Sequence, residues 1–90
     1  GNIVVIRFLG CLCLVAGNLT MSGTLTTATK ILDATKVPAN LTGTRYINAS
    51  NSNKSSWTRP LAVRVTAAGG LDVNYGAAGR YDFSMLYFTA

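Results

Sequence analysis

Histidine and glutamate are absent from this chain of 90 residues, and its only side-chain carboxylates are Asp33, Asp72 and Asp82. Without histidine, the usual serine and cysteine nucleophiles lack their general base. A zinc site would have to combine two cysteines with scattered aspartates. Exposure to solvent or cross-strand pairing with Arg64 and Arg80 is the ordinary explanation for Asp72 and Asp82, which we place on outward strand faces. We therefore predict no enzymatic activity, no metal site and no cofactor.

Charge of either sign is scarce. Charged residues make up 12% of the sequence, and eight lysines and arginines give a formal net charge of +5. These cations are scattered singly, whereas nucleic-acid binding calls for a basic patch interleaved with aromatic residues. We predict no nucleic-acid partner. A chain this short buries only part of its surface alone, so we expect other chains to help cover it.

The apolar run IVVIRFLGCLCLVAG, residues 3–17, is too short to span a membrane as a helix. Residues 8–17 resemble the apolar core of a signal peptide, but Arg7 is the only charge ahead of them. We therefore expect the run to belong to the folded protein as a buried strand, or as a strand pair bent at Gly10. Arg7 should then face solvent or pair with an aspartate from another chain.

Cys11 and Cys13 form a C-x-C pair inside this run. On a strand both thiols would lie on the same side, too close in sequence for an unstrained disulfide with each other. A metal site of this kind normally needs a second pair, which the sequence lacks. We expect two buried free thiols, with an interchain disulfide or a redox role as the alternatives.

Residues 17–30, GNLTMSGTLTTATK, alternate apolar side chains with threonines and serines. This period of two predicts a strand with one apolar face and one uncharged hydroxyl face. Because a hydroxyl face carries no charge, it can pack against copies of itself without repulsion. The predicted assembly residues are the apolar ones of the N-terminal run and of this strand: Ile3, Val5, Leu19, Met21 and Leu25.

Residues 27–44 form a predicted linker with at most one short helix, which Pro38 ends. The composition changes after this linker, so we divide the chain into residues 1–42, an extended β and linker region, and residues 43–90, a small antiparallel β domain. Within the second part, the alternation over residues 61–75 predicts a β-hairpin.

The last strand, near residues 81–88, is apolar on both faces, with Leu86 and Phe88 on the second one. A strand that is apolar on both faces must be covered on both. The same holds for the N-terminal run. These patterns predict an all-β fold: a small antiparallel β-sandwich or β-head with an extended N-terminal strand region, completed by oligomerisation.

Two stretches carry a resemblance to a known family. GNLTMSGTLTTAT, residues 17–29, resembles segments that recur in bacteriophage tail fibres and related appendage proteins. GTRYINAS and RPLAVRVTAAGGLDVNYG, within residues 43–76, are similar to the small β heads near the ends of such fibres. The resemblance implies a non-enzymatic structural protein of the virion, outside the cell. It also implies a homotrimer that associates with other virion proteins.

A role in host attachment would fall to the polar loop at residues 51–58 and its Trp57, with Tyr46 and Arg59 as neighbours. An aromatic ring flanked by amides and a guanidinium suits a host surface glycan. The alternative is that Trp57 caps the core. A second class of function is a pilus- or fimbria-like subunit, in which the N-terminal strand NIVVIRFLG completes the sheet of a neighbouring subunit.

Overall fold

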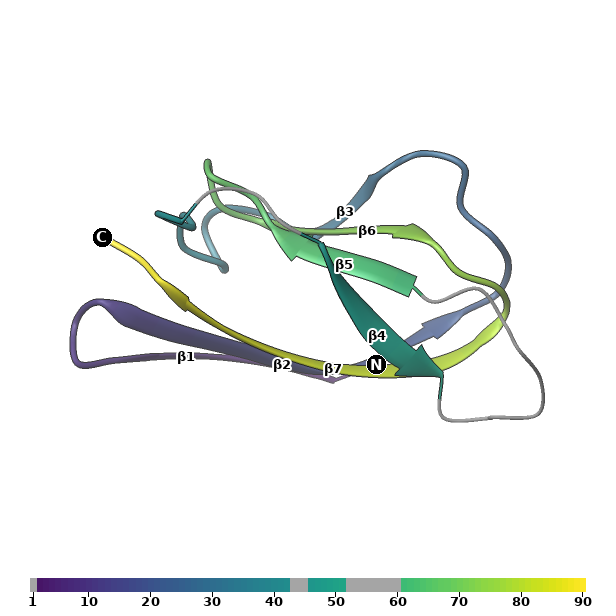
Figure 1. Ribbon diagram of the computed structural model, residues 1–90, viewed down its shortest axis with the longest axis horizontal. Coiled ribbons are helices and arrows are strands. Elements are labelled where there is room, and N and C mark those ends of the chain that lie inside the picture. The colour runs from purple at the N-terminus through teal and green to yellow at the C-terminus, as the bar shows by residue number, and fades with distance from the viewer. Residues whose placement is uncertain (1, 43–45, 52–60) are drawn as a thin grey trace.

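The computed structural model describes residues 2–42, 46–51 and 61–90, and strands within these ranges form one antiparallel sheet (Figure 1). None of the described residues is helical. The prediction of an all-β fold is therefore confirmed. The strands are β1 (Ile3–Phe8), β2 (Leu12–Met21), β3 (Thr29–Leu32), β4 (Ile47–Asn51), β5 (Leu61–Val65), β6 (Leu71–Tyr75) and β7 (Gly79–Phe88).

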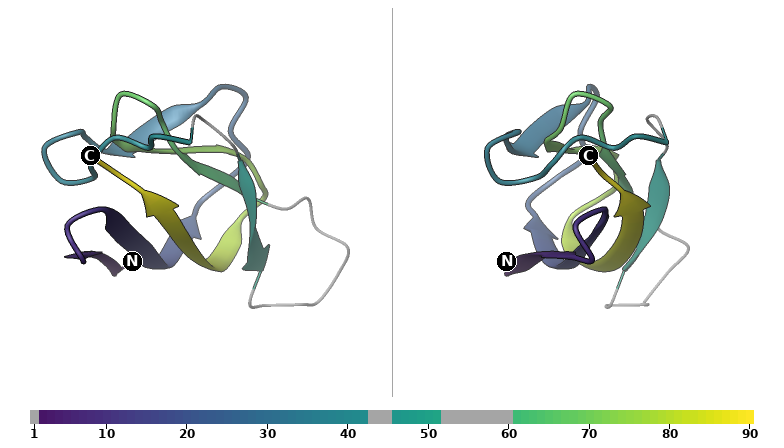
Figure 2. Two further views of the ribbon diagram at one scale, coloured as in Figure 1. Left: turned by 60° about the vertical axis from the view of Figure 1, so that its left-hand side comes forward. Right: turned by 90° about the vertical axis from the view of Figure 1, so that its left-hand side faces the viewer.

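The strand order across the sheet is β1-β2-β7-β4-β5-β6-β3. Strand β4 forms the corner, because its first three residues pair with β5 and its last two with β7. The sheet curls at this corner, so that β1, β2 and β7 lie opposite β5, β6 and β3 (Figures 1 and 2). The two predicted regions, 1–42 and 43–90, thus contribute strands to the same sheet, since β2 pairs with β7 and β3 with β6.

The core lies between the two layers and follows from alternation along the strands. Strands β2 and β7 pair over ten residues each, from Leu12 opposite Phe88 to Met21 opposite Gly79. Their odd-numbered residues point inward. Strands β5 and β6 cover these residues from the other side, and their pairing confirms the hairpin predicted for 61–75. The buried apolar residues are Cys13, Val15, Val37, Ala49, Leu61, Val63, Val65, Leu71, Val73, Tyr81, Phe83, Met85 and Tyr87.

The strand predicted along residues 17–30 is wrong in its second half. Strand β2 ends at Met21, and the chain bends until β3 begins at Thr29. The physical reason is the length of the neighbouring strand β7. Met21 pairs with Gly79, the first residue of β7, so the backbone groups of a longer β2 would have no hydrogen-bond partners in the sheet. Of the hydroxyl face, only Thr20 remains on β2.

The predicted linker contains a strand rather than a helix. Strand β3 pairs with β6 and closes one edge of the sheet. A turn follows, in which the N–H groups of Lys36 and Val37 both donate to the carbonyl of Asp33 at 3.1 Å. The four residues of β3 are too few to show a period in the sequence, and the pairing with β6 decides their conformation.

The N-terminal run forms a hairpin, as predicted for a strand pair bent at Gly10, but the prediction that it is buried is wrong for the outer side of β1, because no described segment covers that side. Strands β1 and β2 pair antiparallel from Ile3 opposite Gly17 to Phe8 opposite Leu12. Cys13 is fully buried, but Cys11 is exposed. The prediction of two buried thiols is wrong for Cys11, because this residue lies in the turn before β2 rather than on the strand.

Candidate functional site

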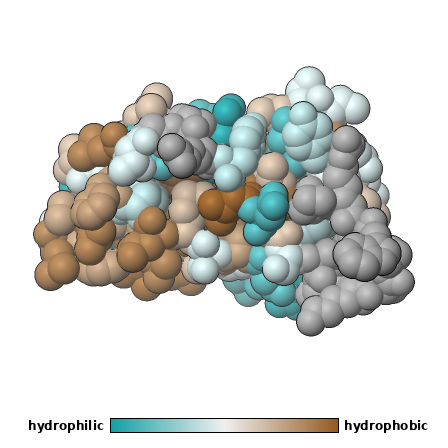
Figure 3. Space-filling model, viewed as in Figure 1, coloured by the Kyte–Doolittle hydropathy of each residue, from teal (hydrophilic) through white to brown (hydrophobic). Residues whose placement is uncertain are grey.

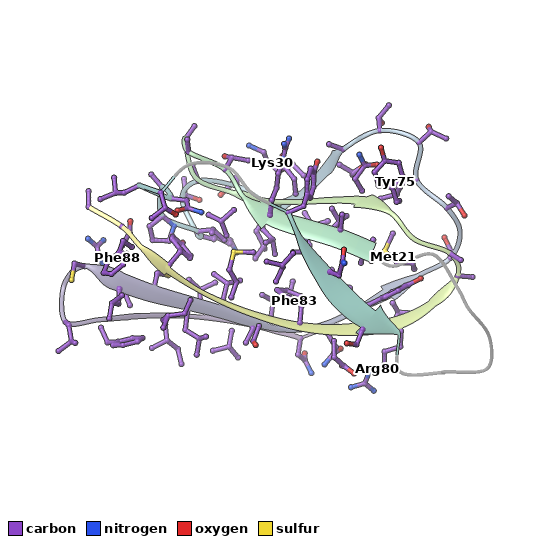
Figure 4. The ribbon with its side chains drawn as sticks, viewed as in Figure 1. Met21, Lys30, Tyr75, Arg80, Phe83 and Phe88 are labelled. Carbon is purple, nitrogen blue, oxygen red and sulfur yellow. The ribbon has the colours of Figure 1, made fainter. Side chains whose placement is uncertain are left out.

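The layer of β1, β2 and β7 is apolar on its inner face and over part of its outer face. Its inner face contributes side chains such as Phe83, which lies between the two layers (Figure 4). An antiparallel sheet with one face in solvent normally carries polar residues there. In this protein the outer face is instead apolar over half the length of the strands, and this makes it the principal candidate site.

The outer side chains fall in register across the three strands, so that they form rows. We call the nine residues of these rows the outer apolar face. From the β1–β2 turn inward along the strands, the rows are Phe8, Leu12 and Phe88; Ile6, Leu14 and Leu86; and Val4, Ala16 and Ser84.

Large side chains of the outer apolar face are open to solvent. Leu86 is 59% exposed, Phe88 54% and Val4 51%. Apolar residues gather at the end of the molecule formed by β1, β2 and the end of β7 (Figure 3). A contiguous apolar patch on a soluble protein is characteristic of a surface that binds another molecule.

The β1–β2 turn extends this apolar surface. Leu9 is 82% exposed and has a φ of 55°, a left-handed conformation that is unfavourable for leucine. The turn is held in place by Arg7, whose guanidinium donates to the carbonyl of Gly10 at 3.1 Å and to that of Ala90. Arg7 is exposed, in agreement with the first of the two predictions for it.

The opposite end of the same outer face is polar. Asn18 and Thr20 of β2 lie opposite Asp82 and Arg80 of β7. The Arg80 guanidinium lies 3.8 Å from the Asp82 carboxylate, and both side chains are more than half exposed. The two residues belong to the same strand, so this is not the predicted cross-strand pair. Such an exposed pair contributes little to stability. The outer face therefore changes from apolar to polar along the strands.

A shallow hollow of about 410 Å³ opens where β4 diverges from β7. Its lining includes Asn48 and Ser50 of β4 together with Asp82 and Ser84 of β7. These amide, hydroxyl and carboxylate groups can exchange hydrogen bonds with water or with the hydroxyl groups of a sugar.

A second polar cluster surrounds Arg64, on the layer of β5 and β6. The guanidinium lies 3.3 Å from the carboxylate of Asp72 and 4.7 Å from the centroid of the Tyr46 ring. The predicted pairing of Asp72 with Arg64 is confirmed, although Asp72 is buried rather than solvated. Of the predicted receptor residues, Tyr46 is 40% exposed, whereas Trp57 and Arg59 lie outside the described residues.

Four of the predicted assembly residues lie on the inner faces of β1 and β2, and the fifth, Leu25, lies in the connection between β2 and β3. All five are half-buried and pack against the core of their own chain. The exposed apolar residues occupy the opposite faces of the same strands, as well as that of β7. The sequence indicated that two-sided apolar strands need a cover, but a period of two does not reveal which face the same chain covers. The five predicted assembly residues are Ile3, Val5, Leu19, Met21 and Leu25.

Among the residues that the structure describes, two ionisable side chains have shifted pKa values, and both shifts have local causes. Burial raises the pKa of Tyr87 above its ordinary value, and contact with the Cys13 thiol raises it further. The Tyr87 hydroxyl donates to the carbonyl of Pro38 at 2.8 Å. The hydroxyl and the N–H group of Thr35 lower the pKa of Asp33. Within the described ranges, no cluster of three or more His, Cys, Asp or Glu residues could hold a metal ion.

Comparisons with protein-family models, with curated proteins and with solved structures gave no match. Among the described residues there is no helix with the length and apolar character needed to cross a membrane.

Proposed function

We propose that this protein is a non-enzymatic structural component of a bacteriophage tail fibre or a similar virion appendage, and that it works by associating with copies of itself and with other virion proteins. The observation that supports this proposal is the outer apolar face, which no part of the described chain covers. The resemblance of residues 17–29 and 43–76 to fibre segments provides the biological setting.

The size of the exposed apolar surface favours a binding role over chance exposure. Six large apolar residues on or beside the outer apolar face are between 38% and 82% exposed. At roughly 100 Å² each, they present about 600 Å², the upper end of what a soluble monomer leaves open. The six residues are Val4, Ile6, Phe8, Leu9, Leu86 and Phe88.

Host attachment is the second part of the proposal. Tyr46 offers an exposed ring beside the Arg64 guanidinium, and such a ring can stack on the apolar face of a sugar. Trp57 and Arg59 stay in the proposal on sequence grounds alone. Loss of binding to host cells in a Trp57→Ala variant, with assembly unchanged, is the expected result for a receptor contact.

The proposed function is tested by the molar mass of the purified chain, measured by light scattering from micromolar to millimolar concentration in reducing buffer. The reducing buffer prevents interchain disulfides through the exposed Cys11. A stable closed oligomer is expected, and the homotrimer implied by the resemblance is one such form. A monomer over the whole range would contradict self-association.

A pilus-like subunit is the alternative, and the position of β1 favours it. This strand lies at an edge of the sheet and pairs with β2 alone among the described strands. An apolar edge strand can transfer to the sheet of a neighbour. Open-ended polymers of the intact chain, together with soluble monomers after deletion of residues 2–10, would support strand donation.

A further inference from the structure

The outer apolar face has a gradient of side-chain size, which bears on what covers it. On β1 and β7 the side chains become smaller from the row next to the β1–β2 turn to the third row, and on β2 two leucines are followed by an alanine. The series are Phe8, Ile6 and Val4 on β1; Leu12, Leu14 and Ala16 on β2; and Phe88, Leu86 and Ser84 on β7.

We infer that this face binds the same face of a second copy of the chain, about a two-fold axis that lies between the two sheets and runs across the strands. This inference rests on the proposed function, since it names the partner of the surface described there. A two-fold arrangement of this kind makes the strands of the two copies antiparallel. It also keeps each strand over its own counterpart.

This symmetry makes the size gradient self-complementary. Leu12 of one copy lies over Ala16 of the second copy, and Leu14 lies over Leu14 near the axis. The same exchange places Phe88 over Ser84. Away from the axis a larger residue thus meets a smaller one, and at the axis identical residues meet, an arrangement that favours close packing of the two faces.

The area and charge of the face also fit a second copy. With Leu9 of the adjoining β1–β2 turn included, about 600 Å² per chain gives about 1,200 Å² buried in the pair, the lower limit for a specific interface. Each chain has a formal net charge of +5, yet no residue of the outer apolar face is charged. Two basic molecules can therefore meet here without bringing like charges together.

The decisive variant adds apolar bulk where the packing has no room for it. Ala16→Phe places a large ring in the small row, where it would collide with Leu12 of the second copy. If the face bound a second copy through apolar contact alone, without a specific packing, the added ring would strengthen dimerisation. In the two-fold packing the added ring weakens dimerisation. Because the two-fold axis produces this collision twice in each dimer, we expect the dissociation constant of the dimer to rise about 100-fold.

Two further variants control the experiment. Thr20→Phe adds the same ring to the same face of β2, but at the polar end and outside the rows. It should leave the dimer unchanged. The double variant Leu12→Ala with Ala16→Phe exchanges the large and small positions of β2. It should restore the dimer, because each new ring meets the space left by Leu12.

The measurements are the molar mass by light scattering and the dissociation constant by analytical ultracentrifugation. Circular dichroism and thermal unfolding establish that every variant folds. The expected result is a wild-type dimer that Ala16→Phe alone disrupts. Unchanged or tighter association of Ala16→Phe would overturn the two-fold packing.

Other outcomes separate this inference from the proposed function. A wild-type trimer would overturn the two-fold pair and leave self-association standing. A wild-type monomer at every concentration would overturn both. A monomer that sediments with phosphatidylserine vesicles, equally well with and without Ala16→Phe, would assign the outer apolar face to lipid instead.

Discussion

Replacing Gly17 with alanine should displace β1 from β2, because the two backbones meet at this position without space for a side chain. A Cβ atom at residue 17 would lie 2.1 Å from the Asn2 carbonyl oxygen and 2.8 Å from the Ile3 Cα. Both contacts are with backbone atoms, which cannot rotate away. The start of β1 would have to move by about 1 Å to restore an ordinary contact distance.

The loss of stability caused by this movement follows from the interactions that it weakens. The N–H group of Asn18 donates to the Asn2 carbonyl at 2.9 Å, and losing this bond costs about 1 kcal/mol. Ile3 is half-buried against the core, and its partial release costs another 1 kcal/mol or so. The φ of 156° at Gly17 adds roughly 1 kcal/mol of strain for alanine. Gly17→Ala should therefore lower the free energy of unfolding by about 3 kcal/mol.

Urea unfolding followed by circular dichroism measures this difference, with Gly23→Ala as the matched control. A Cβ atom at Gly23 would meet nothing within 4 Å, and its φ is not left-handed. Gly23→Ala should thus change the free energy of unfolding by less than about 0.5 kcal/mol, or raise it slightly. Equal stability of the two variants would refute the steric argument. If β1 moves, Val4 moves with it, so Gly17→Ala should also weaken association.

Two other predictions concern the thiols and the buried phenol. Cys11 is exposed and Cys13 is fully buried, so a thiol reagent should modify one cysteine in each native chain and both cysteines in urea. Rapid modification of both cysteines in the native protein would contradict the burial of Cys13. Because the folded pKa of Tyr87 is raised, its protonated form stabilises the fold below the unfolded pKa of about 10, and this contribution is lost as the pH rises further. The stability difference between wild type and Tyr87→Phe should therefore narrow above about pH 10, and a constant difference from pH 8 to 11 would contradict the shift.

The local patterns of the sequence were sufficient for the class of fold. Alternation over 61–75 predicted the β5–β6 hairpin, and Gly10 marked the bend between β1 and β2. Local patterns failed where pairing with a strand far away in the sequence determines where a strand begins or ends. Strand β2 stops at Met21 because β7 begins opposite it, and β3 exists because β6 pairs with it. Hydrogen bonds between strands far apart in the sequence decide such ends, and a window of neighbouring residues does not contain them.

The outer apolar face shows most clearly which features local sequence patterns predict and which depend on long-range strand pairing. The alternation in the sequence was enough to predict that the N-terminal run and the final strand are apolar on both sides, and that both sides would need a cover. It did not show which side the chain covers with its own strands. The curl at β4 brings β5 and β6 over the odd-numbered residues of β2 and β7, so Val15 and Tyr81 become core while Leu14 and Leu86 stay on the surface. A period of two defines the two faces of a strand but does not show which face is buried. Pairing between strands that are far apart in the sequence decides this.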